Sequence, residues 1–264
     1  MSKVATRKIV VITGASSGIG AEMAYQVALK GWLPVLMARS LDKLELLQSN
    51  IEEKTGIQPI VYRLDVRDHS AVQQTFQTVD ESVGRIDVLI NNAGYGKFDY
   101  FTDANLDDIE GMFDTNVVGL MTCTKAVLPG MIDRRAGHII NIASQAGKIA
   151  TSKSSVYAAT KHAVLGFTNS LRMELEEYQI DVTAVNPGPI QTNFFEVADQ
   201  SGQYQKNVER YMLQPENVAS KIVDSIDRPV REINLPKWMD LGSRAYQVFP
   251  GLIEKIAGKS FKQK

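Results

Sequence analysis

The sequence has little of the residues that form disulfides and bind metals. Its 264 residues include one cysteine and three histidines. The cysteine, Cys123, has no partner for a disulfide within the chain, and its apolar surroundings predict a buried position in a helix. A zinc site is not supported, because such sites draw several ligands from cysteine, histidine and carboxylates. We therefore expect no bound metal and a reducing, cytoplasmic location.

Long apolar runs and an excess of one charge are missing as well. No uninterrupted apolar stretch approaches the roughly 18 residues that a membrane-spanning helix needs. The basic residues at the N-terminus lead into a glycine-rich turn instead of a cleavage site. The 29 basic and 30 acidic side chains give a formal charge of -1, so there is no electrostatic footprint for nucleic acid. We expect neither secretion, nor a transmembrane segment, nor a nucleic-acid partner.

What the sequence does contain is a regular alternation of apolar strands and helical patterns. Helices are predicted between the strands, among them 41–54, 70–83 and a long one at 107–134. Strands are predicted at 9–13, 33–38, 59–66, 86–90, 138–144, 182–188 and 232–236, and the first is a continuous β-branched run, typical of a parallel strand covered on both faces. This order predicts an α/β fold with one doubly wound sheet, formed by a single domain over residues 1–264.

A glycine-rich turn follows the first strand and opens a helix. It reads Gly14-Ala15-Ser16-Ser17-Gly18-Ile19-Gly20. Free backbone N–H groups and the helix dipole favour an anion at such a turn, and a pyrophosphate is the expected ligand. The glycine spacing differs from the usual dinucleotide fingerprint G-x-G-x-x-G. A tight turn without a ligand is the alternative, but the flanking strand and helix favour nucleotide binding.

The ends of the second and third strands bear on the choice of nucleotide. In NAD-binding folds an acidic side chain after the second strand binds the ribose 2′-hydroxyl, whereas this chain has Ala38-Arg39-Ser40 there. Arg39 suits a 2′-phosphate, so we expect NADP(H) over NAD(H). The alternative is that Arg39 is a surface residue that starts the next helix. Asp65 is either the cap of the following helix, an acceptor for an adenine amino group, or both.

A second group of residues suggests proton chemistry. Tyr157 and Lys161 are four residues apart in a helical stretch and project from one face. A nearby ammonium lowers the pKa of a phenol, which would make the pair a proton donor and acceptor near neutrality. On the spacing alone, a half-buried ring beside a solvated charge is the favoured interpretation. Ser144 lies at the end of the fifth strand, and Asn116, in apolar surroundings, is either a structural clip or part of a relay.

Taken in order, these motifs resemble the classical short-chain dehydrogenase/reductase family. The likeness extends over nearly the whole chain up to about Pro236. It implies a Rossmann-type sheet of about seven parallel strands with helices on both faces, a nicotinamide cofactor, a small carbonyl or alcohol substrate, and a homodimer or homotetramer. The residues that carry it are Thr13 to Gly20, Asn91-Asn92-Ala93-Gly94, Asn116, Ser144, Tyr157-x-x-x-Lys161 and Pro187-Gly188-x-x-x-Thr192.

The resemblance also implies roles for individual residues. Tyr157 becomes the general acid towards a carbonyl oxygen, and Lys161 lowers its pKa and binds the nicotinamide ribose. Ser144 polarises the carbonyl, and Asn116 holds a relay water. Family members that prefer NADP often have a basic residue where this chain has Ser17, so the preference depends on Arg39. The residues expected to bind the cofactor are Gly14, Ser16, Ser17, Gly18, Ile19, Gly20, Arg39, Asp65, Val66, Asn92, Ala93, Gly94, Tyr157, Lys161, Pro187, Gly188, Ile190 and Thr192.

Two segments lie outside these motifs. Residues 193–212 are polar and weakly periodic, and they are either a substrate loop or an ordinary surface connection. The extension 237–264 is mildly amphipathic and interrupted at Pro250, and it caps the substrate cleft, packs between subunits or, less favoured, touches a membrane surface. The expected activity is NAD(P)-dependent carbonyl reduction or alcohol oxidation. A regulatory nucleotide-binding protein without catalysis, and an epimerase or dehydratase on the same scaffold, are the alternatives.

Overall fold

A seven-stranded parallel sheet forms the centre of the molecule. The computed structural model describes residues 7–199 and 201–261. The strand order is β3-β2-β1-β4-β5-β6-β7, so the chain winds outwards in both directions from β1 and β4. The predicted doubly wound α/β fold is confirmed, with strand ends shifted by a few residues. The strands are β1 Ile9–Thr13, β2 Leu33–Ala38, β3 Ile60–Arg63, β4 Val88–Asn91, β5 Gly137–Ile142, β6 Ile180–Pro187 and β7 Glu232–Leu235.

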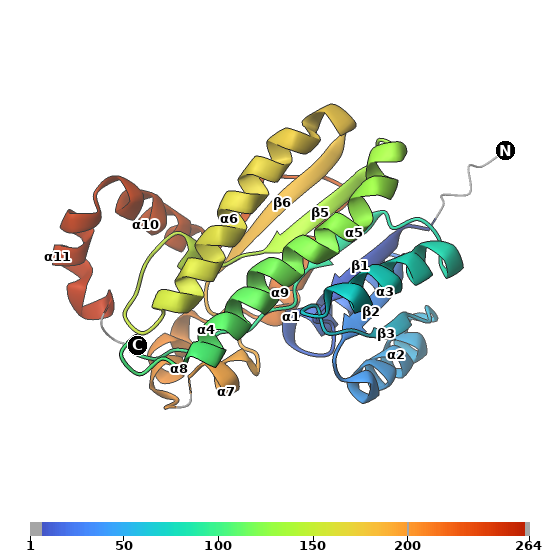
Figure 1. Cartoon of the computed structure of the whole chain (residues 1–264). Coiled ribbons are helices and arrows are strands. Elements are labelled where there is room, and N and C mark those ends of the chain that lie inside the picture. The colour runs from blue at the N-terminus through green and yellow to red at the C-terminus, as the bar shows by residue number, and fades with distance from the viewer. Residues whose placement is uncertain (1–6, 200, 262–264) are drawn as a thin grey trace.

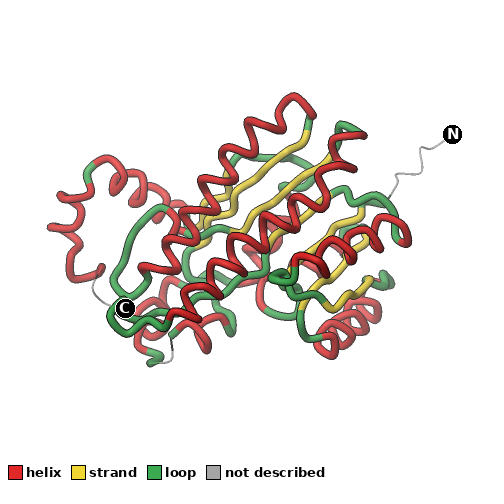
Figure 2. Tube along the Cα trace, viewed as in Figure 1, coloured by secondary structure: helices red, strands yellow, loops and turns green. Residues whose placement is uncertain are grey.

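Helices cover both faces of this sheet, as Figures 1 and 2 show. Side chains from α1 Gly18–Leu29, α2 Leu41–Thr55 and α9 Pro215–Asp224 pack on one face. The other face is covered by α3 His69–Ser82, α5 Leu120–Asp133 and α6 Ser155–Leu175, the last of which ends in the 3-10 turn η3 Glu176–Tyr178. The inner strands β1, β2, β4, β5 and β6 are therefore largely buried on both sides, which explains their mostly apolar sequences, whereas the edge strands β3 and β7 are only partly buried.

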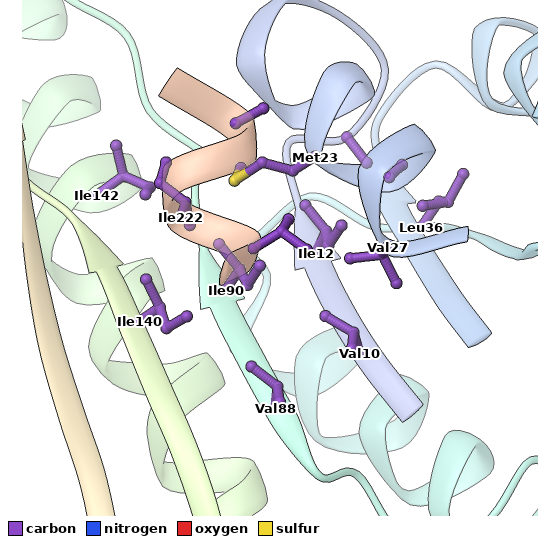
Figure 3. Close-up of a cluster of buried hydrophobic side chains, with 14 of the residues drawn as sticks. Val10, Ile12, Met23, Val27, Leu36, Val88, Ile90, Ile140, Ile142 and Ile222 are labelled. Carbon is purple, nitrogen blue, oxygen red and sulfur yellow. The ribbon is translucent and has the colours of Figure 1, made fainter. Parts of the chain in front are cut away.

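The core is built from branched and flexible apolar side chains that pack between the helices and the sheet. In Figure 3, Met23 from α1 and Ile222 from α9 pack against Ile12 and Ile90 of the central strands. Cys123 belongs to the core of the opposite face, as its apolar surroundings predict. Burial raises the pKa of its thiol to about 12, so the thiol is unreactive at neutral pH.

The long helix predicted at 107–134 is wrong in one respect, because it is interrupted. The structure has α4 Leu106–Phe113, a π-helical turn η1 Asp114–Gly119, and then α5. A π turn holds one more residue per turn than an α-helix and is found mostly at functional sites. The apolar periodicity on either side is unchanged, so the sequence pattern alone does not reveal the wider turn. It lies around Asn116, a buried residue.

The segment 193–212 is more ordered than its weak periodicity predicts. It contains the short helices α7 Phe194–Ala198 and α8 Gln203–Val208, followed by the 3-10 turn η4 Glu209–Tyr211. Helices this short bury single side chains rather than a periodic face, which explains why the pattern is missing.

Two helices, α10 Lys237–Val248 and α11 Pro250–Phe261, end the described chain, and the break at Pro250 is confirmed. Along the described ranges, no helix combines the length and the apolar character that crossing a membrane requires.

Two leucines on α2 offer a matched test of the core. Leu44 is fully buried, whereas Leu46 is 66% exposed. We expect Leu44→Ala to lower the free energy of unfolding by about 3–5 kcal/mol, because it removes buried methyl groups and leaves a cavity. Leu46→Ala, with the same change in helix propensity, should cost less than about 0.5 kcal/mol. Chemical denaturation measures both, and equal losses would contradict the proposed packing of α2.

Candidate active site

One large cavity runs along the edge of the sheet where the parallel strands end at their carboxyl termini. Its volume is about 820 Å³. The structure brings together around this cavity the glycine-rich turn, Ser144, Tyr157, Lys161 and every other residue predicted to bind a cofactor. Asn116 lies behind the wall instead, and its neighbour Thr115 takes part in the lining. Crevices at this edge are the usual ligand sites of doubly wound sheets.

The glycine-rich turn is shaped by contacts between backbones. Gly14 has φ of +64°, a left-handed conformation that glycine tolerates. A Cβ atom on Gly14 would lie 2.7 Å from the Cα of Ala93, and one on Gly20 would lie 2.4 Å from the carbonyl oxygen of Gly14. Ser17 caps α1 without a side-chain hydrogen bond, and the first turn of α1 has no acidic residue. The turn therefore presents free N–H donors and a positive helix end, which fit a pyrophosphate.

A mutual lock holds this turn against the end of β4. The backbone N–H groups of Asn92 and Ala93 both donate to Thr13 Oγ1 at 3.1 Å. In return, Asn92 Nδ2 donates to the carbonyl oxygens of Thr13 and Gly14 at 3.0 Å. Because each side satisfies polar groups of the other, the two motifs keep one relative position.

The end of β2 is basic. Arg39, Ser40 and Lys43 line the cavity there. Neither a hydrogen bond nor an ion pair joins Arg39 to another residue within the described ranges, and Ser40 caps α2 without using its hydroxyl. An acidic residue, Asp42, lies in the same turn but not in the lining. The sequence reasoning missed Lys43, whose signal is its place one helical turn after Arg39.

Asp65 does not cap the following helix, so that alternative is wrong. The cap of α3 is Asp68, whose side chain accepts from the N–H of Ala71 at 2.9 Å. Asp65 lines the cavity. The guanidinium of Arg67 binds its carboxylate, and Arg67 Nη2 donates to Asp65 Oδ2 at 2.6 Å. The hydrogen bond from Arg67 lowers the pKa of Asp65 against the effect of burial. Asp65 is therefore an ionised hydrogen-bond acceptor in the lining of the cavity.

Ser144, Tyr157 and Lys161 converge at the far side of the cavity. Tyr157 and Lys161 lie on α6 and are 9% and 6% exposed. The Lys161 ammonium donates to the carbonyl oxygen of Ile142 at 2.8 Å and lies 5.7 Å from the centroid of the Tyr157 ring. Ser144 Oγ accepts from the N–H of Ala146 at 3.0 Å, which orients the hydroxyl. The interpretation as a solvated charge beside a ring is excluded, because both side chains are buried.

The predicted lowering of the Tyr157 pKa is wrong. Burial raises the pKa of Tyr157 to about 12, although a hydrogen bond with Ser144 acts to lower it. Burial also lowers the pKa of Lys161 to about 8. Desolvation disfavours the charged form of each group and outweighs their mutual attraction here. At neutral pH the phenol is therefore fully protonated, ready to donate rather than to accept a proton.

Asn116 acts as a clip between three segments. Its Oδ1 accepts from the N–H of Tyr95 at 3.0 Å, and its Nδ2 donates to the Tyr95 carbonyl oxygen at 2.8 Å. Asn116 Nδ2 donates its second hydrogen bond to Thr160 Oγ1 at 3.1 Å. Both amide protons are therefore used in joining the π turn to α6 and to the loop after β4. Of the two alternatives, these contacts favour the clip.

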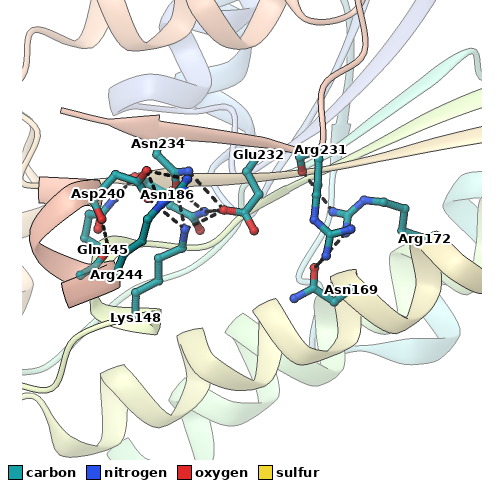
Figure 4. Close-up of polar contacts among 11 residues, drawn as sticks. Gln145, Lys148, Asn169, Arg172, Asn186, Arg231, Glu232, Asn234, Asp240 and Arg244 are labelled. Atoms are coloured by element: carbon teal, nitrogen blue, oxygen red, sulfur yellow. Dashed lines mark hydrogen bonds and ion pairs between the residues drawn. The ribbon is translucent and has the colours of Figure 1, made fainter. Parts of the chain in front are cut away.

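A buried lysine that sequence reasoning missed ties the turn after Ser144 to the C-terminal part of the chain. Lys148 Nζ donates to Glu232 at 2.6 Å, Asn234 at 2.9 Å and Asp240 at 3.3 Å, as Figure 4 shows. Burial opposes ionisation of Glu232, but hydrogen bonds from Lys148 and Asn234 outweigh it and hold its pKa below the ordinary value. The partners are 84 to 92 residues away along the chain, so no local signal exists.

Aromatic rings surround Tyr157, and sequence reasoning missed these as well. The rings of Phe98 and Phe194 have centroids 5.8 Å and 5.7 Å from that of Tyr157. Gly96 allows this approach, since a Cβ there would lie 2.9 Å from both Phe194 and Tyr157. The aromatic residues come from loops and from α7, and their spacing in the sequence is irregular.

Fold and site together define a class of protein. A Rossmann-type sheet, a glycine-rich turn suited to an anion, and a serine, a tyrosine and a lysine that line the same cavity are the features of nucleotide-dependent oxidoreductases. The sequence model of the family described as "short chain dehydrogenase" matches residues 8–202. The chain therefore belongs to the short-chain dehydrogenase family, oxidoreductases that act on CH–OH and carbonyl groups.

Curated relatives agree with this assignment. The NADP-dependent 3-hydroxy acid dehydrogenase of Schizosaccharomyces pombe is 36% identical, and the match covers 84% of this chain and 87% of the yeast protein. Human dehydrogenase/reductase SDR family member 7 is 38% identical over 72% of this chain. The chain spans only 58% of that human protein's length.

Solved structures share the fold over most of the chain. A short-chain dehydrogenase from Sphingobium yanoikuyae in complex with NADPH superposes with a TM-score of 0.79 and 27% identity, over 92% of this chain and 95% of the other. A short-chain dehydrogenase/reductase from Burkholderia phymatum in complex with NAD has a TM-score of 0.85, covering 93% and 95% of the two chains. At 24% identity, the second likeness concerns the fold alone.

The buried amine of Lys161 predicts a specific pH dependence of stability. Its pKa is about 8 in the folded chain, against an ordinary value of 10.5. Between pH 8 and 10 the unfolded chain therefore binds more protons, and stability rises with pH by up to about 1.4 kcal/mol per unit. Above pH 10 the raised pKa of Tyr157 acts in the opposite direction.

We expect Lys161→Met to remove this rise, whereas Lys125→Met, at an exposed position of α5, should leave it in place. Urea denaturation at several pH values measures the slope. An identical slope in the Lys161→Met variant would show that the amine is not desolvated.

Proposed function

We propose that this chain is an NADPH-preferring carbonyl reductase, which also oxidises the corresponding alcohol. The observation that carries the proposal is the convergence of the partly buried Ser144 and the buried Tyr157 and Lys161 on a cavity whose other end is the glycine-rich turn. The activity of the whole protein, its substrate and its partners are part of the proposal, since longer relatives extend beyond this chain.

In the proposed reaction, Tyr157 gives its phenolic proton to the carbonyl oxygen. When bound, the reduced nicotinamide supplies the hydride to the carbonyl carbon. Negative charge grows on the oxygen as the carbonyl becomes an alcohol, and a positioned acid together with the Ser144 hydroxyl stabilises that charge. The raised pKa of Tyr157 keeps the phenol protonated at neutral pH, which suits the direction of reduction.

Lys161 and Asn116 hold the reacting groups in place. One proton of the Lys161 ammonium is used by the carbonyl oxygen of Ile142, which leaves two donors for the hydroxyls of the nicotinamide ribose. Asn116 fixes the loop that contains Gly94 and Tyr95, two residues of the cavity lining that would border the bound cofactor. A relay water held at Asn116 is retained as part of the proposal, because Asn116 Oδ1 has a second lone pair.

The glycine-rich turn would hold the pyrophosphate, with Ser16, Ser17 and Ile19 around it, and Asp65 and Val66 would border the adenine. Thr192 lies opposite the turn, since a Cβ on Gly18 would be 3.4 Å from its methyl group. The preference for NADPH is supported by the cations Arg39 and Lys43 and by the unused hydroxyl of Ser40 at the end of β2.

Replacement of the phenol tests the mechanism. Tyr157→Phe should lower kcat/KM for NADPH-dependent reduction of aldehydes and ketones by about 10²–10⁴-fold, since it removes the general acid. The dissociation constant of NADPH should change little. Tyr62→Phe, which removes an exposed hydroxyl on β3, is the matched control and should keep full activity. Unimpaired reduction by Tyr157→Phe would contradict the mechanism, and a non-catalytic or epimerising protein would reduce nothing in either form.

Reversal of one charge tests the choice of cofactor. Arg39→Asp should shift the ratio of NADPH to NADH affinity towards NADH by about 10- to 100-fold, because it replaces a charge-assisted hydrogen bond with repulsion. Arg63→Asp is a suitable control, since Arg63 pairs in register with Ala38 yet lies outside the cavity lining. Equal shifts of the affinity ratio in both variants would show that any negative charge on this surface has the same effect, and that Arg39 does not bind the 2′-phosphate.

A homodimer or homotetramer stays part of the proposal, and the molar mass in solution decides it.

A further inference from the structure

The part of the cavity beyond Tyr157, which we call the substrate end, has aromatic walls. It is bordered by Phe98, Ile149, Phe194, Tyr204 and Met239. The rings of Phe98 and Tyr204 meet edge to face with centroids 5.3 Å apart. These side chains come from the loop after β4, the loop before α6, the helices α7 and α8, and α10. Five separate segments thus contribute apolar surface to one space.

Positive charge is concentrated elsewhere in the cavity. Arg39 and Lys43 lie at the end of β2, three positions from β5 in the sheet, which is about 14 Å at the usual strand spacing. Lys161 lies beneath Tyr157 and is engaged with the carbonyl oxygen of Ile142. A carboxylate that reached Lys161 would occupy the place of the reacting carbonyl.

Two other lysines near the substrate end are held away from it. Lys148 is bound by Glu232 and Asp240. The ammonium of Lys153 lies over the ring of Tyr100, 5.0 Å from its centroid. Neither residue lines the cavity. Among the residues that the structure describes, these contacts leave the substrate end without a further cation that matches a carboxylate or phosphate group.

The charged side chain that does border the substrate end is acidic. Glu196, on α7, lines the cavity and is exposed. Behind it, Asp199 accepts from Ser201 at 2.6 Å and from the N–H of Gln205 at 3.0 Å, and its pKa is lowered by these bonds against the effect of burial. An anionic substrate would lose its hydration here and meet the negative charge of Glu196.

We infer that the substrate is a neutral carbonyl compound with an apolar, ring-sized body, rather than an oxo acid. The inference rests on the proposed function and names the substrate class for the same site. It departs from the activity in the name of the yeast relative, a 3-hydroxy acid dehydrogenase. The carbonyl carbon takes up the hydride that NADPH would supply when bound, its oxygen takes up the phenolic proton of Tyr157, and water returns a proton to the phenolate, so that the carbonyl compound, NADPH and H⁺ give the alcohol and NADP⁺.

The test compares two aldehydes that differ only in charge, methyl 4-formylbenzoate and 4-formylbenzoate. With NADPH, kcat/KM for the ester should exceed that for the carboxylate by at least about tenfold, mainly through a lower KM. Phe194→Ala should raise KM for the ester by about tenfold, since it removes an aromatic wall. Phe101→Ala, at a side chain that is 68% exposed and outside the lining, should leave KM unchanged.

Reversal of the charge of Glu196 gives a second, independent test. Glu196→Lys should raise kcat/KM for the carboxylate relative to the ester by about fivefold or more, because it provides the missing cation. Equal or better turnover of the carboxylate by the unsubstituted protein would overturn the inference and leave the reductase proposal standing. Absence of NADPH- or NADH-dependent reduction of both aldehydes would overturn the two together.

Discussion

Hydrogen bonding between parallel strands is the constraint on which the rest of this molecule depends. The register pairs Ile12 with Ile90 and Asn91 with Asn141, so neighbouring strands end at nearly the same level. Residues far apart in the sequence thereby reach one edge without any contact of their own. A slip of one residue would turn every side chain of a strand to the opposite face. The lock between Thr13 and Asn92 fixes the two central strands at the point where the ligand groups begin.

Burial at this edge serves chemistry at the expense of stability. Lys161 and Tyr157 are taken out of water, and the pKa of each moves towards its neutral form. A buried ammonium satisfied by one carbonyl oxygen is an unfavourable arrangement for a structural residue. The π turn at Asn116 is a second departure from regular structure in the same place. Such departures gather where function, rather than folding, selects the residue.

Much of the fold could be predicted from the sequence, because its signals are local. The continuous apolar strands, the glycine-rich turn and the spacing of Tyr157 and Lys161 each belong to a single segment. What the sequence did not reveal depends on distant partners. Lys148 is an ordinary lysine until β7 and α10 fold against it, and the direction of the Tyr157 pKa follows from a burial that spacing does not encode. The cap of α3 is a different case, because Asp65 and Asp68 are both local candidates and only the residue at which the helix begins decides between them.

Two stretches of the chain form the cavity, one inside and one outside the region that matches the family model. The anion-binding turn and the reacting groups lie within residues 8–202, which match the family as a whole. Tyr204, Trp238, Met239 and Gly242, which complete the lining, lie after that region. The Lys148 network joins the second stretch to the first through side chains, in addition to the pairing of β7 with β6 in the sheet. Exchange of the last quarter of the chain would alter the lining of the cavity, and so the choice of substrate, without altering the reacting groups. Substrate choice and reaction can therefore diverge separately during evolution.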